Sequence, residues 1–122
     1  MRSYDVAVAS LAIGAPTKWT DNVIAHNALP GVMKIQRGVA RRISHTALLQ
    51  LVIARQLQTA MGMSAHDAVR IGLALVESGV VHHGPISISI DLAALERQLA
   101  PRIAHALESA PTRPRGRPPK RS

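Results

Sequence analysis

Apolar residues recur at helical spacing along most of this chain, between short groups of turn residues, and predict a mainly helical fold. Two helices are expected first, over Val6–Ile13 and about Thr17–Ala28. Gly14-Ala15 separates them, and Pro16 suits the first turn of the second. Three later helices are expected over Ser44–Met61, Ser64–Ser78 (closed by Gly79) and Asp91–Ser109, with Ser64 and Asp91 as N-terminal caps.

Two other stretches have strand character, so the predicted fold class is mainly α with small β-hairpins. Val32–Ile43 is expected to form a hairpin that turns near Arg37-Gly38. A second strand, turn and strand is expected over Val80–Val81, His82–Pro85 and Ile86–Ile90. The Ile-Ser alternation of its last strand is typical of a half-buried strand.

The last helix carries an apolar stripe and one proline. Pro101 is expected to bend or interrupt the helix. The stripe is core or dimer interface, and we favour a homodimer because two-fold assemblies are the commonest. Its members are Leu92, Leu95, Leu99, Ile103 and Leu107.

Composition removes several classes of function. The 122 residues include no Cys, which excludes disulfides, thiolate metal sites and Cys nucleophiles. We expect no metal at the adjacent His82 and His83, because neighbouring residues of a strand point to opposite sides. No catalytic constellation or cofactor motif is evident, so we expect no enzyme and no cofactor. No apolar run reaches the roughly 20 residues of a membrane span, so we expect a soluble intracellular protein.

The charge is strongly basic and uneven. The formal net charge is +8, and the last 12 residues supply +5 of it with no acidic residue. A basic balance of this kind favours a polyanionic partner. The Pro, Arg and Gly that follow Ser109 cannot form a core, so residues 111–122 are expected to be a disordered tail.

The tail has the chemistry of a minor-groove ligand. Narrow A·T-rich minor grooves attract guanidinium groups, which Arg115 and Arg117 would insert in opposite directions. Gly116 lets the backbone approach the groove floor, while Pro114 and Pro118 keep the segment extended. This segment resembles the AT-hook of high-mobility-group chromatin proteins. The resemblance implies a DNA site formed by Arg113, Pro114, Arg115, Gly116, Arg117, Pro118, Lys120 and Arg121. The competing interpretation is a solvated basic tail.

The body resembles another DNA-binding family. The order of elements and the motifs Gly14–Thr17, Leu29–Gly31, Gly38–Ser44 and Met61–Ser64 are similar to the MerR-like winged helix-turn-helix regulators, including the small excisionase type. The resemblance implies that the second helix enters the major groove with Thr17, Lys18, Thr20 and Asn22, and that a wing contacts phosphates with Lys34, Gln36, Arg37, Arg41 and Arg42. Trp19 is expected in the core, and Arg55 has no assigned role.

These patterns divide the chain into a winged helix-turn-helix domain (1–78), a strand and helix for dimerisation (79–110) and an AT-hook tail (111–122). The expected function is transcription regulation through double-stranded, preferably A·T-rich DNA, by a homodimer in the bacterial cytoplasm and nucleoid. Two alternatives stay open. One is an architectural, nucleoid-associated protein, and the other is an antitoxin-like module that pairs with another protein.

Overall fold

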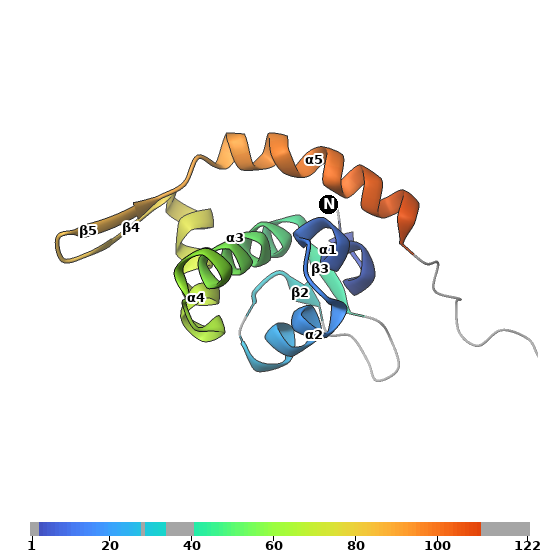
Figure 1. Cartoon of the computed structure of the whole chain (residues 1–122), viewed down its shortest axis with the longest axis horizontal. Helices are drawn as coiled ribbons and strands as arrows, with labels where there is room; N and C mark the ends of the chain where they lie inside the picture. The colour runs from blue at the N-terminus through green and yellow to red at the C-terminus, as the bar shows by residue number, and fades with distance from the viewer. Residues whose placement is uncertain (1–2, 28, 34–40, 111–122) are drawn as a thin grey trace, which may run out of the picture.

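The computed structural model describes residues 3–27, 29–33 and 41–110, and within them the chain forms five helices and five short strands (Figure 1). In chain order these are β1 (Ser3–Tyr4), α1 (Val6–Ile13), α2 (Thr17–His26), β2 (Val32–Met33), β3 (Arg42–Ser44), α3 (His45–Met61), α4 (Ala65–Ser78), β4 (Val80–His83), β5 (Ile86–Ser89) and α5 (Leu92–Ser109). The prediction of a mainly helical chain with small antiparallel hairpins is confirmed.

The helix ends follow from capping chemistry. Ser64 and Asp91 cap their helices as predicted, and Ser44 caps α3. In each case a side-chain oxygen accepts the backbone N–H of the residue three positions later, at 3.0–3.2 Å. Each such bond satisfies a donor that the helix itself cannot pair. One expectation was slightly wrong, because Pro16 is the residue before α2 rather than part of its first turn.

Helix α3 lies at the centre of the body, with α1, α4 and α5 packed around it (Figure 1). Its residues are buried on almost every side, including Leu48 and Leu51, which have no exposed surface. The core consists of Ala, Leu, Ile and Val, with Tyr4 as the one buried ring among the described residues. Trp19 is half-buried against this core, and its Nε1 donates to Gln58 Oε1 at 2.8 Å.

The first sheet has three strands rather than the two expected. Its order is β1-β3-β2, and both pairings are antiparallel: Tyr4 faces Ile43 across one, and Val32 faces Ile43 across the other. The two residues of β1 are too few to produce a periodic pattern, so the sequence did not indicate this strand. Its presence covers the second edge of β3.

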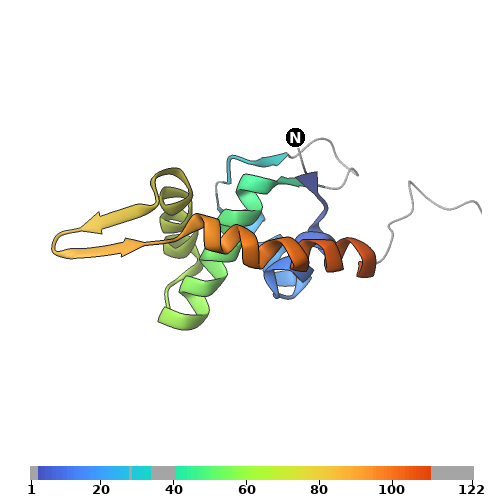
Figure 2. The same ribbon diagram turned by 90° about the horizontal axis from the view of Figure 1, so that it is seen from above.

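Helix α5 belongs to the same core as the rest of the chain. It lies across one side of the body and ends beside α1 (Figure 2), where Arg102 Nη2 donates to the Ile13 carbonyl at 2.9 Å. The helix is continuous through Pro101. The expected stripe is partly wrong, since Leu107 is 59% exposed and Ala106 is buried in its place.

Helix α5 and the helices that precede it have one common core. Leu99, Ile103 and Ala106 share one hydrophobic cluster with α1 and α3, so no separate core begins at residue 79. The buried part of the stripe is therefore used within the chain and is not available as a dimer interface. None of the helices in the described ranges is long and apolar enough to cross a bilayer.

The second hairpin, β4–β5, extends away from the body (Figure 1). Its register pairs Val80 with Ser89 and His83 with Ile86, so strand β4 includes both histidines that we had placed in the turn. The half-buried strand that the alternation predicted is only partly observed. Ile88 and Ile90 touch the core, whereas Ile86 is 61% exposed.

Candidate nucleic-acid interface

The turn between α1 and α2 fixes where the second helix begins. Gly14 has φ 83° and ψ 34°, a left-handed conformation that disfavours residues with a Cβ atom. Its N–H and that of Ala15 both donate to the Ser10 carbonyl, at 2.9 and 3.0 Å. The helix therefore stops within one residue, and Gly14–Pro16 redirects the chain into α2.

A buried hydrogen bond then fixes α2 against α1. Ser10 Oγ donates to Thr20 Oγ1 at 2.8 Å, and both residues are buried. Thr20 has no exposed surface, so its assignment as a base-reading residue is wrong. Its hydroxyl is already committed to Ser10, and its place beside Val23 and Ile24 is on the inner face of α2.

The opposite face of α2 is polar and open to solvent. Thr17, Lys18 and Asn22 are exposed, as the sequence led us to expect, and Asp21 lies among them. Thr17 with Asp21, and Lys18 with Asn22, are four residues apart, about one helical turn, so the four side chains form one continuous surface. Hydroxyl, ammonium and amide groups on one helix face are the groups that contact phosphates and base edges in a major groove.

Only the base of the expected wing lies within the described residues. Val32 and Met33 of β2 pair with Ile43 and Arg42 of β3, which confirms the antiparallel flanks of the predicted hairpin. Lys34, Gln36 and Arg37 lie outside the described residues.

The two described arginines at this base differ in whether the guanidinium group is already hydrogen-bonded within the chain. Arg42 donates from Nε to Ser3 Oγ at 3.2 Å and from Nη2 to the Ser3 carbonyl at 2.9 Å, so its guanidinium already holds β1. Arg41 is half-exposed. Arg41 is therefore the better candidate of the two for a phosphate contact.

The segment that resembles an AT-hook, with Arg113, Pro114, Arg115, Gly116, Arg117, Pro118, Lys120 and Arg121, lies entirely outside the described residues. The structure does describe what precedes it. Helix α5 is anchored on α1 by buried Ala106 and by the bond from Arg102, and half-buried Ala110 packs against the core at its end. Ala110, the last described residue, thus lies against the core of the body.

The histidines form no shared centre in the part of the chain that the structure describes. His82 and His83 are exposed neighbours on β4. Across residues 3–27, 29–33 and 41–110, no three His, Asp or Glu side chains come together in a way that could hold a metal ion.

Several polar contacts were not foreseen. The Tyr4 hydroxyl lies 3.2 Å from His45 Nδ1, and His45 Nε2 lies 2.7 Å from Glu96 Oε1, which links β1, α3 and α5. The Arg55 guanidinium lies 5.2 Å from the centroid of the Trp19 ring, so it stabilises the α2–α3 contact.

One of the missed contacts could have been found from the sequence. Ser10 stands within an apolar run, and Thr20 falls on the same side of its helix as Val23 and Ile24. A helical projection of both segments would have placed each hydroxyl on the inner face. The Tyr4–His45–Glu96 contacts join three distant segments, and no local pattern indicates them.

Comparison of the whole chain with protein-family models, with curated proteins and with solved structures finds no match.

Proposed function

We propose that this protein binds double-stranded DNA and that its C-terminal segment selects A·T-rich minor grooves. The observation that carries the proposal is the sequence Pro114-Arg115-Gly116-Arg117-Pro118 within a segment of five basic and no acidic residues. Two guanidinium groups around a glycine fit a narrow, electronegative groove, and prolines lower the entropy lost on binding. The outer cations would add salt-dependent affinity through phosphates.

The way α5 holds the start of the tail supports a combined mode of binding. Twelve extended residues reach about 40 Å, which exceeds the roughly 34 Å of one duplex turn. A tail that begins beside α1 can therefore follow the same duplex that α2 contacts. Joining two weak sites in this way raises the overall affinity by effective concentration.

In this proposal α1 and α2 act as a helix-turn-helix and β2–β3 as the wing of a MerR-like fold. Thr17, Lys18 and Asn22 would face the major groove. Asp21 on the same face would oppose phosphates but could accept a hydrogen bond from cytosine N4. A surface of this composition suits a regulator that reads a defined site, and DNA binding would place the protein on the nucleoid.

The test uses two double variants with equal loss of charge. Arg115→Ala with Arg117→Ala removes the groove-inserting groups, whereas Arg113→Ala with Arg121→Ala removes two flanking cations. We expect the first pair to weaken binding to an A·T-rich duplex by roughly 10- to 100-fold and to a G·C-rich duplex much less. The flanking pair should weaken both duplexes to a similar degree. Fluorescence anisotropy measures this, and equal losses from the first pair on both duplexes would contradict groove recognition.

The main alternative is an architectural protein that coats DNA with little choice of sequence. A salt titration on specific and random duplexes separates the two, because a regulator retains discrimination between the duplexes as salt rises.

We also propose a homodimer, which would double the DNA contacts. The exposed Ile86 on β5 offers apolar surface for a second copy, or for the unrelated chain that an antitoxin-like module would bind. The stoichiometry at saturation distinguishes these assemblies.

A further inference from the structure

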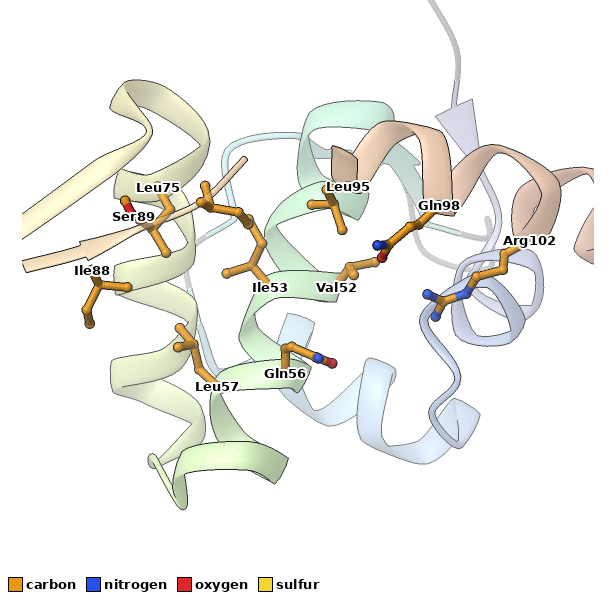
Figure 3. Close-up of a pocket in the computed structure, with 11 residues that line it drawn as sticks. Val52, Ile53, Gln56, Leu57, Leu75, Ile88, Ser89, Leu95, Gln98 and Arg102 are labelled. Carbon is orange, nitrogen blue, oxygen red and sulfur yellow. The ribbon is translucent and has the colours of Figure 1, made fainter. Parts of the chain in front are cut away.

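A pocket of about 210 Å³ lies where α3, β5 and α5 meet (Figure 3). Most of its wall is aliphatic and includes Val52 and Ile53 of α3 and Leu95 of α5. For scale, a dry engineered cavity of roughly 150 Å³ accommodates benzene. The pocket is thus large enough for a ligand of roughly eight non-hydrogen atoms, by that comparison.

One end of this pocket is polar and cationic. The side chains of Gln56 from α3 and of Gln98 and Arg102 from α5 line it, and the ends of Gln56 and Arg102 are directed toward one another (Figure 3). Arg102 uses Nη2 to donate to the Ile13 carbonyl, which fixes the guanidinium in place. A guanidinium has five N–H donors, so this bond leaves capacity for a ligand.

The charge of the wall identifies the class of ligand. No Asp or Glu is among the residues that line the pocket, so Arg102 is the one charged group there. An aliphatic chain matches the apolar part, and a carboxylate matches a guanidinium flanked by two amides. The chain's own tail is a poor occupant, because its five cations would meet Arg102.

We propose that this pocket binds a small aliphatic carboxylate, with its chain between α3 and α5 and its carboxylate on Arg102. Such a ligand would stabilise the contact between these helices. The proposal does not depend on DNA binding, since the pocket uses none of the residues assigned to the DNA interface.

The first test compares two probes of equal size on the unaltered protein. Hexanoate and hexanamide both have eight non-hydrogen atoms, but only hexanoate carries a charge. By isothermal titration calorimetry we expect hexanoate to bind roughly 10-fold or more tightly than hexanamide. Pentanoate should bind about fourfold more weakly than hexanoate, the loss expected for one buried methylene. Equal binding of the two probes, or no binding of hexanoate, would overturn the proposal.

The second test removes the same charge at two places on α5. Both side chains are exposed, but only Arg102 lines the pocket and Arg97 does not. Arg102→Gln should weaken hexanoate binding by about 10-fold or more, and Arg97→Gln should change it less than about twofold. Equal effects would mean that the anion is bound by general charge alone, which contradicts the assigned site. If a second copy of the chain fills the pocket instead, hexanoate will compete with it and lower the mass measured by light scattering, and this too would overturn the proposal.

Discussion

The two hairpins of this chain share antiparallel pairing but differ in how their strands are covered. At the base of the first, Ile43 of β3 is completely buried, because β1 and β2 pair on either side and α3 starts immediately after Ser44. In the second, Ile86 of β5 is 61% exposed, and the hairpin extends beyond the body (Figure 1). Similar apolar strands thus have opposite environments.

The charges of the two hairpins also differ. Arg41 and Arg42 lie at the base of the first, whereas β4–β5 holds no Lys or Arg. An exposed cation can contact a polyanion, whereas a hairpin without Lys or Arg and with an exposed Ile86 suits a protein contact. Strand alternation thus indicates a hairpin but does not indicate what the hairpin contacts. The neighbouring elements and charges decide what it contacts.

The largest expected difference between the hairpins is in stability. Ile43→Ala leaves a cavity in the core and should lower the free energy of unfolding by about 3 kcal/mol. Ile86→Ala, which removes the same atoms from an exposed position, should lower it by less than about 0.5 kcal/mol. Urea denaturation of both variants, at a concentration at which the chain is monomeric, measures this, and similar losses would contradict the exposed position of Ile86.

A smaller difference is expected in DNA affinity. Arg41→Gln and Ser87→Glu each change the net charge by the same amount, one at the base of the first hairpin and one on β5. Loss of one phosphate contact in Arg41→Gln should reduce affinity by roughly threefold to fivefold at low salt, and reduce the salt slope by about 1. Ser87→Glu should leave both unchanged. If the two variants weaken binding equally, only the total charge matters and the first hairpin has no special place in the interface.

Local chemistry made much of the fold predictable. The caps at Ser44, Ser64 and Asp91 and the glycines that end α1, α3 and α4 act through nearest neighbours, so the helix boundaries could be inferred from sequence. Strand β1 and the packing of α5 on α1 depend on contacts between distant segments. For that reason the sequence left open whether the stripe of the last helix is core or dimer interface, and the structure buries Leu99 and Ile103 in the core.

The candidate site was predictable to a smaller extent. The exposed positions Thr17, Lys18 and Asn22 follow from helical periodicity, but the burial of Thr20 depends on its partner Ser10 in another helix. The engagement of Arg42 by Ser3 likewise depends on a strand that periodicity cannot reveal. The tail differs from both, because its motif is contained in nine consecutive residues and needs no tertiary context to be identified.

The most direct test is a titration of the full chain and of a chain ending at Ala110 against two duplexes of equal length, one A·T-rich and one G·C-rich. If the C-terminal segment selects A·T-rich DNA, the full chain will prefer the A·T-rich duplex. The shortened chain will keep its thermal stability and lose this preference. A shortened chain that retains the same preference would contradict groove selection by the C-terminal segment.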